Sequence, residues 1–175
     1  NIFEPAERKA AFEQLINLIE EKEYHLDVGV LGGRVLFHVL TEFGYSDLAF
    51  SMITRPDYPS YGNWIARGAT TLWEVFQPEG SDRIGSLNHH FWGDISSWFT
   101  QALSGIRMAP HGEPNEVDFR PSFISRLTHA EAFHIAPAGR IASAWERDED
   151  DVIVLTVELP STMHGVIRLE SGYVF

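Results

Sequence analysis

The spacing of apolar residues changes from helical to alternating near Pro110, and this change limits the fold more than any other feature of the sequence. Before Pro110, apolar residues recur every three or four positions, as on the buried face of an amphipathic helix. From about residue 130 onwards, apolar and polar residues alternate, as they do in half-buried β-strands. The pattern therefore predicts a two-part chain, first all-α and then all-β.

The helical part contains four predicted helices, at residues 4–24, about 32–43, 47–54 and 88–103. Pro56 and Pro59 end the third helix, because proline cannot continue a helical hydrogen-bond pattern. The last helix has an apolar stripe, formed by Phe91, Ile95, Trp98, Phe99 and Ala102. A stripe at this spacing is typical of a packed core rather than of a cofactor site.

The second part contains four predicted strands, at residues 130–135, 141–146, 152–159 and 165–169. Turn-forming residues separate them, and the acidic run at 148–151 suits a solvated hairpin tip. Short strands at this spacing predict a small antiparallel β-sandwich. Residues 110–116 are predicted as a linker between a helical domain at 1–109 and a β-domain at 117–175.

The charge balance excludes some classes of partner. The 175 residues carry a formal net charge of −12, with acidic residues in excess in both parts. Such a chain offers no basic surface for nucleic acid or for an anionic membrane. No apolar run approaches the ~20 residues that span a bilayer. The chain has no cysteine and does not begin with methionine, and we expect a partial or processed polypeptide.

The stretch GATTLWE at residues 68–74 combines small residues, two threonines, a tryptophan and a single carboxylate. Thr70 or Thr71 is predicted to cap a helix, which would place Glu74 in its first turn and favour the ionised carboxylate. An ionised carboxylate can act as a general base. The alternative is that Glu74 is an ordinary exposed glutamate beside an anchoring ring.

The segment between residues 57 and 68 is predicted as a loop dense in aromatic residues and turn formers, and its Tyr61 and Trp64 allow two interpretations. Their ring faces could stack on the C–H side of a sugar. They could equally fill a gap in the core. The residue pattern alone leaves both open.

A metal site built from Glu74, His89 and His90 is disfavoured by the sequence. Adjacent residues on a helix point about 100° apart, so His89 and His90 are poorly placed to hold one ion. The HExxH pattern is also missing. We therefore expect neither a metal nor another cofactor.

Several motifs in the same order resemble bacterial α-L-rhamnosidases, glycoside hydrolases built on a barrel of six helical hairpins. They are HLDVGVLG at 25–32, GATTLWE at 68–74, NHHFWG at 88–93 and LSGI at 103–106. Further along, PAGRIASAW at 137–145 resembles a strand of the β-sandwich that follows this barrel. The resemblance implies part of an (α/α) six-hairpin barrel followed by that sandwich.

The resemblance also implies an activity, which is the hydrolysis of terminal α-L-rhamnosyl bonds with inversion of configuration. It makes Glu74 the general base and places His89 on the sugar hydroxyls, and we predict Asn88, Trp64 and Trp73 as further substrate contacts. The predicted partner is a rhamnose-containing glycoside. The family's acidic segment with the general acid has no match here, so we expect the chain to need the preceding part of the same enzyme.

Two other functions remain open from the sequence. Helical-hairpin barrels also carry hydrolases of other sugars, including trehalases and glucoamylases. Alternatively, Trp64, Trp73 and Trp92 form the platform of a non-catalytic carbohydrate-binding module, in which Glu74 is merely polar.

Overall fold

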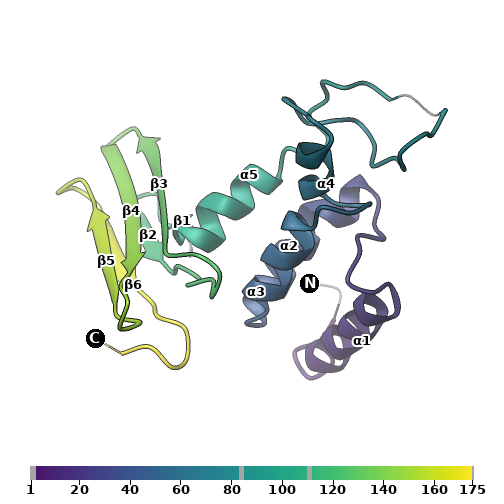
Figure 1. Cartoon of the computed structure of the whole chain (residues 1–175). Helices are drawn as coiled ribbons and strands as arrows, with labels where there is room; N and C mark the ends of the chain where they lie inside the picture. Colours follow the sequence, from purple (N-terminus) through teal and green to yellow (C-terminus); the bar gives the residue numbers. More distant parts are fainter. Residues whose placement is uncertain (1–2, 83–84, 110–111, 175) are drawn as a thin grey trace. The chain divides into compact units, whose positions relative to one another are not determined.

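The computed structural model describes residues 3–82, 85–109 and 112–174. Its helices precede its strands (Figure 1), as the change in periodicity predicts. Two compact units form, and neither is continuous in sequence. Unit 1 comprises residues 1–33 and 50–92, and unit 2 comprises residues 34–49 and 93–175. Two of the three boundaries between the units fall within helices, so both units contain helical segments.

The helices are α1 (Arg8–Glu21), α2 (Val30–Glu42), α3 (Ser46–Thr54), α4 (Tyr61–Ala66) and α5 (Ile95–Trp98), and α5 continues into a π-helical turn, η1 (Phe99–Leu103). α1 buries Phe12 and Ile19, two residues that a helical repeat places on one side. None of the helices in the described residues is long and apolar enough to cross a bilayer.

α4 lies inside the aromatic segment that the sequence predicts as a loop. Ser60 caps it, because its hydroxyl accepts the backbone N–H of Asn63 at 2.9 Å and donates to the carbonyl of Arg55 at 2.6 Å. The Cβ-free Gly62 allows the helix to approach the preceding turn, where a Cβ would lie 2.3 Å from the Arg55 carbonyl oxygen. The prediction of a loop is therefore wrong at residues 61–66.

The last predicted helix is also shorter than expected. It begins at Ile95 instead of residue 88, and the backbone N–H of His89 bonds to the Leu72 carbonyl of an earlier segment. Ile95, Trp98 and Ala102 are buried, as the apolar stripe predicts, while Phe91 and Phe99 are exposed. The Trp98 indole N–H donates to the Phe37 carbonyl and to the Thr41 hydroxyl, which anchors α5 within unit 2.

Unit 2 contains six strands in two sheets: β1 (Ile106–Met108), β2 (Glu116–Phe119), β3 (His129–Ala136), β4 (Gly139–Arg147), β5 (Ile153–Glu158) and β6 (His164–Ile167). The sheet orders are β1-β2-β6 and β3-β4-β5. The ladders are antiparallel except that between β2 and β6, which is parallel. β1 and β2 were not among the predicted strands, because each is too short to show a clear alternation.

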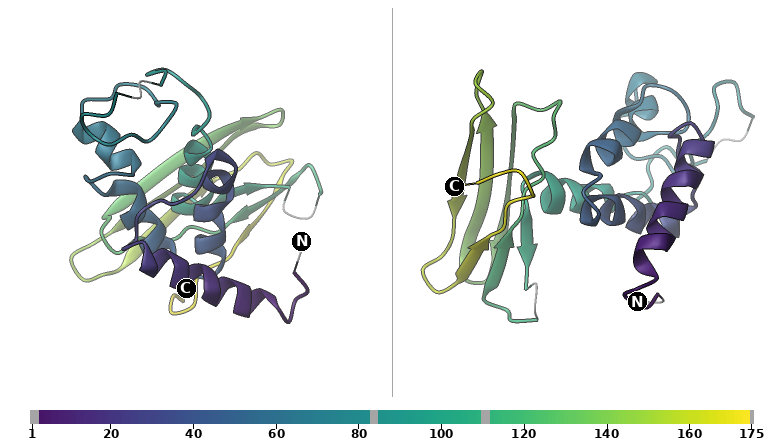
Figure 2. Two further views of the ribbon diagram at one scale, coloured as in Figure 1. Left: turned by 90° about the vertical axis from the view of Figure 1, so that its right-hand side faces the viewer. Right: turned by 90° about the horizontal axis from the view of Figure 1, so that it is seen from below.

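The two sheets form the two layers of a sandwich (Figure 2) around one shared core. Ile106, Val117 and Phe119 contribute to it from the first sheet, and Ala136 and Ile141 from the second. On β4, Ile141, Ser143 and Trp145 point inward and alternate with less buried neighbours, which confirms the half-buried strand pattern.

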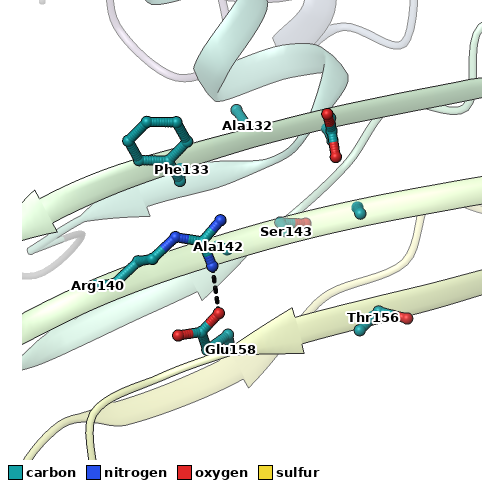
Figure 3. Close-up of a pocket in the computed structure, with 9 residues that line it drawn as sticks. Ala132, Phe133, Arg140, Ala142, Ser143, Thr156 and Glu158 are labelled. Carbon is teal, nitrogen blue, oxygen red and sulfur yellow. Dashed lines mark hydrogen bonds and ion pairs between the residues drawn. The ribbon is translucent and has the colours of Figure 1, made fainter.

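The outer face of the β3-β4-β5 sheet has a shallow groove of about 570 Å³ (Figure 3). Ala142 and Ala144 line it from the central strand, and Phe133 lies on β3 with 61% of its surface exposed. Arg140 lies over the Phe133 ring, 5.2 Å from its centroid, and forms an ion pair with Glu158.

Candidate active site

Residues 72–74 and 86–89 lie side by side within unit 1, joined by two backbone hydrogen bonds. The backbone N–H of Glu74 donates to the Ser86 carbonyl at 2.8 Å, and the N–H of His89 donates to the Leu72 carbonyl at 2.8 Å. This pairing places Glu74 and His89, fifteen positions apart in sequence, on the same short pair of segments.

The predicted helix after Thr70 or Thr71 is wrong. The backbone groups of residues 72 and 74 bond across to residues 86 and 89, so they cannot form the bonds of a helical turn. Thr71 instead donates its hydroxyl to the Leu87 carbonyl, on the same pair of segments. Cross-chain pairing, rather than a helix N-terminus, therefore positions Glu74, and His89 is not at a helix start either.

The Glu74 carboxylate is partly exposed and is held by a backbone amide. Its Oε2 accepts the N–H of Ser86 at 2.8 Å. Within the part of the chain that the structure describes, no arginine or lysine forms an ion pair with Glu74. Its partner among the described residues is thus a neutral amide and not a cation.

The backbone of Glu74 is fixed from its other side by Trp92. The indole N–H of Trp92 donates to the Glu74 carbonyl at 3.0 Å, and the Tyr61 hydroxyl donates to the Trp92 carbonyl at 3.2 Å. A Cβ at Gly33 of α2 would lie 2.5 Å from the Trp92 ring, so the ring packs directly on the helix backbone. Buried donors with satisfied partners and close packing restrict motion of this carbonyl.

Trp64 and Trp73 belong to a buried aromatic cluster with Phe76. Trp64 stacks on Phe76 with ring centroids 4.2 Å apart, and Trp73 lies 6.0 Å from Trp64. Trp64 is 2% exposed and Trp73 is 9% exposed. Of the two interpretations of the aromatic segment, packing in the core is the role that the contacts of Trp64 show. The sugar contacts of Trp64 and Trp73 stay a prediction.

The guanidinium of Arg67 covers Trp73 and lies 5.0 Å from the centroid of its ring. Arg67 also donates to the Gln77 carbonyl at 2.6 Å. These contacts tie the end of α4 to the segment that follows Glu74.

His89 is half-buried and has a defined tautomer. Its Nδ1 accepts the backbone N–H of Phe91 at 3.2 Å, so in the neutral ring Nε2 carries the proton. His90 stacks parallel to it at 5.1 Å, and Phe91 packs edge-on at 3.8 Å. The side chain of the preceding Asn88 is exposed. An N–H donor held in one orientation suits recognition of a sugar hydroxyl.

Among the described residues, no group of three His, Cys, Asp or Glu side chains is placed to hold a metal ion. The helical geometry that disfavoured a metal site in the sequence does not apply, since His89 and His90 are not on a helix.

A second charged group lies in unit 1, around Asp57. Arg55 donates to both carboxylate oxygens, at 2.9 and 2.7 Å, and His25 Nε2 lies 2.9 Å from Oδ2. The hydrogen bonds from Arg55, followed by that from His25, hold the pKa of Asp57 well below its usual range. Arg55 also donates to the Glu23 carbonyl, so the group joins the turn after α1 to the segment before α4.

Two residues of this site were not identified from the sequence. Gly85 and Ser86 contact the Glu74 side chain, and their signal in the sequence is a Gly-Ser pair typical of a turn. A turn signal does not tell which side chain the turn will meet.

Comparison with known proteins identifies relatives for almost the whole chain. Residues 1–103 match the bacterial α-L-rhamnosidase six-hairpin glycosidase domain, and residues 115–172 match the bacterial α-L-rhamnosidase C-terminal domain. An α-L-rhamnosidase from Streptomyces avermitilis is 33% identical over 166 residues, or 91% of this chain and 16% of that protein. One from Formosa agariphila is 33% identical over 161 residues, or 89% of this chain and 17% of that protein. The chain thus spans about a sixth of the length of these relatives.

Solved structures agree with the sequence matches. The Streptomyces avermitilis α-L-rhamnosidase complexed with L-rhamnose superposes with a TM-score of 0.85 at 31% identity, over 94% of this chain and 16% of the other. The α-L-rhamnosidase from Dictyoglumus thermophilum superposes with a TM-score of 0.81 at 31% identity, over 91% of this chain and 18% of the other.

Proposed function

Because the chain belongs to the bacterial α-L-rhamnosidase family, we propose that it is the C-terminal part of an enzyme that hydrolyses terminal α-L-rhamnosyl bonds with inversion. The observation that carries this proposal is the Glu74 carboxylate, which is held by a backbone amide and not paired with a described cation. The L-rhamnose complex of the Streptomyces avermitilis relative supports the choice of sugar.

In this proposal Glu74 is the general base. It takes a proton from a water molecule, whose oxygen attacks the anomeric carbon of rhamnose. A carboxylic acid on the opposite ring face protonates the leaving oxygen, and inverting glycosidases place the two carboxyl groups about 6.5–9.5 Å apart to fit the water. His89 donates a hydrogen bond from its Nε2–H to a sugar hydroxyl, and Asn88 is a further contact to the sugar. Trp64 and Trp73 complete the predicted substrate contacts, and their packing also holds the Glu74 segment in place.

The general acid is assigned to the part of the enzyme that the relatives possess and this chain does not match. We therefore expect the 175-residue chain alone to be inactive. Loss of general acid catalysis alone reduces the rate by about 10²- to 10⁴-fold. An assay of the isolated chain with an aryl α-L-rhamnoside tests this, and robust turnover contradicts it.

The base is tested by Glu74→Gln in the complete enzyme. The amide keeps the shape of the side chain and cannot accept the proton, so kcat should fall by about 10²- to 10⁴-fold. Glu79→Gln is the matched control, because Glu79 lies in an exposed polar turn close by in sequence and should not alter kcat. Wild-type turnover by Glu74→Gln would contradict the role of a base and favour a carbohydrate-binding module.

Two product measurements complete the test. Proton NMR of the first product should show the β-anomer of rhamnose before mutarotation, and the α-anomer would refute inversion. Release of glucose in place of rhamnose would assign the barrel to another sugar.

In Glu74→Ala, azide should occupy the vacated space and restore turnover by forming a rhamnosyl azide of inverted configuration.

A further inference from the structure

The Gly85-Ser86 turn brings a backbone amide to one oxygen of the Glu74 carboxylate. The Ser86 N–H donates to Oε2 at 2.8 Å, while the Ser86 carbonyl accepts the N–H of Glu74 at 2.8 Å. The same residue therefore binds both the backbone and the side chain of Glu74. Two bonds to one residue fix the direction of the side chain as well as the position of the backbone.

Gly85 makes this approach possible. A Cβ at position 85 would lie 3.3 Å from the Cβ of Glu74 and 3.5 Å from its Oε2. It would also lie 3.0 Å from a methyl carbon of Val75, which is tighter than ordinary van der Waals contact. The absence of a side chain at Gly85 thus lets the turn lie directly against the Glu74 side chain.

Ser86 is itself held in a fixed turn. Its hydroxyl accepts the N–H of Asn88 at 3.2 Å and lies 3.1 Å from the Asn88 carbonyl. The backbone N–H of His89, the residue after Asn88, donates to the Leu72 carbonyl. The amide that binds Glu74 therefore belongs to the same ordered segment that presents Asn88 and His89.

From this geometry we infer that the Ser86 N–H is a positioning group for the general base, which holds Oε2 and leaves Oε1 to take the proton from water. The inference rests on the proposed function. In the step, the water O–H bond breaks and its proton goes to Oε1. The water oxygen bonds to the anomeric carbon as the glycosidic C–O bond breaks, and the leaving oxygen takes a proton from the opposing carboxylic acid.

The test compares two variants of the complete enzyme. Ser86→Pro removes the N–H, and Ser86→Ala keeps it while removing the hydroxyl. Ser86→Pro should lower kcat by about 10- to 100-fold, the range for a hydrogen bond to a charged group, with KM for an aryl rhamnoside unchanged. Ser86→Ala keeps the N–H that binds Oε2, so its kcat should stay well above that of Ser86→Pro. Equal kcat in wild type and Ser86→Pro overturns the inference.

A double-variant measurement separates positioning from general damage. In Glu74→Ala with azide, no carboxylate remains to be positioned, so adding Ser86→Pro should leave the azide-rescued rate unchanged. A matching loss of the rescued rate would show that the proline disrupts the site as a whole, and would overturn the inference. If Ser86→Pro does not fold, the α-hydroxy analogue of serine at position 86 replaces the amide N–H by an ester oxygen. A kcat about 10- to 100-fold below wild type then supports the inference, and a wild-type kcat overturns it.

The inference and the proposed function fail in different ways. Wild-type turnover by Glu74→Gln contradicts the proposed function, whatever Ser86→Pro does. Loss of turnover in Glu74→Gln with full turnover in Ser86→Pro contradicts the positioning role alone.

Discussion

Glu74 in unit 1 and Glu158 in unit 2 are two carboxylates that are bound in different ways. Glu158 forms an ion pair with Arg140 on the exposed face of a sheet (Figure 3). Glu74 is bound by the neutral N–H of Ser86. A guanidinium compensates the charge of its partner, whereas an amide orients a carboxylate without neutralising it. The difference shows that a carboxylate can be oriented by a backbone amide without forming an ion pair.

The surroundings of the two carboxylates differ as well. The segment that carries Glu74 is backed by the buried rings of Trp64, Trp73 and Trp92. The groove beside Glu158 is lined by small residues and by the exposed ring of Phe133. Among the described residues, buried aromatic rings therefore support Glu74, whereas small residues and an exposed ring line the shallow groove beside Glu158.

The largest expected effect comes from a matched pair of tryptophans. Trp92 donates its indole N–H to the Glu74 carbonyl at 3.0 Å, and Trp145 donates to the Leu103 carbonyl at 2.7 Å. Replacing either by phenylalanine leaves a partly buried carbonyl without its donor, which should lower the free energy of unfolding by about 1–3 kcal/mol. Only Trp92→Phe should also lower kcat, by about tenfold, because only Trp92 holds the base. Thermal unfolding and steady-state kinetics of both variants measure this, and a lower kcat in Trp145→Phe alone would break the comparison.

The charged group around Asp57 is expected to stabilise the folded chain in a pH-dependent way. The pKa of Asp57 is lowered in the folded state by Arg55 first and His25 second. A lowered pKa contributes stability above the unfolded value of about 3.9, and this stability is lost as the pH falls below that value. Asp57→Asn should therefore lower Tm by a constant amount above about pH 5, and the difference from wild type should shrink below about pH 4.

Asp150→Asn is the control for this measurement, because Asp150 lies at the exposed tip of the β4–β5 turn in unit 2. Its Tm should follow the wild-type curve from pH 3 to pH 7 within about 1 °C. A difference between wild type and Asp57→Asn that persists undiminished at pH 3 would contradict the role of the charged carboxylate.

The smallest effect is expected at Glu158. Exposed ion pairs contribute about 0–1 kcal/mol and are screened by salt, so Glu158→Gln should change the free energy of unfolding by less than about 1 kcal/mol. It should leave kcat unchanged, in contrast with Glu74→Gln. Urea unfolding at low and high salt measures the first effect, and a kcat that falls with Glu158→Gln would give the sheet face a role in catalysis.

Much of the architecture could be predicted from local patterns. The helices at α1, α2 and α3 and the strands β3 to β6 follow the expected segments, because the burial of one side of a helix or strand leaves a repeat in the sequence. α4, β1 and β2 did not follow, because segments of three to six residues hold too few repeats to show a period. The family itself could be recognised from the order of several motifs, and the matches to both α-L-rhamnosidase domains confirm it.

The candidate site was also predicted only in part from the sequence. The sequence pointed to Glu74 and His89 by their residue types and motifs, but it predicted a helix cap where the structure has two segments joined by backbone hydrogen bonds. Helix capping is a local event that a few residues can suggest. Pairing between residues 72–74 and 86–89 depends on segments separated by a turn, and no local pattern specifies it.

The sequence by itself determined the order of an α part and a β part, the family, and the carboxylate worth testing, because these depend on residue type, period and motif order. The tertiary structure alone decided what holds that residue: the amide of Ser86 binds its carboxylate, the missing side chain at Gly85 leaves space for it, and the indole of Trp92 binds its backbone carbonyl. The physical reason is that backbone donors are present at almost every residue, and only the path of the folded chain selects which of them meets a given side chain.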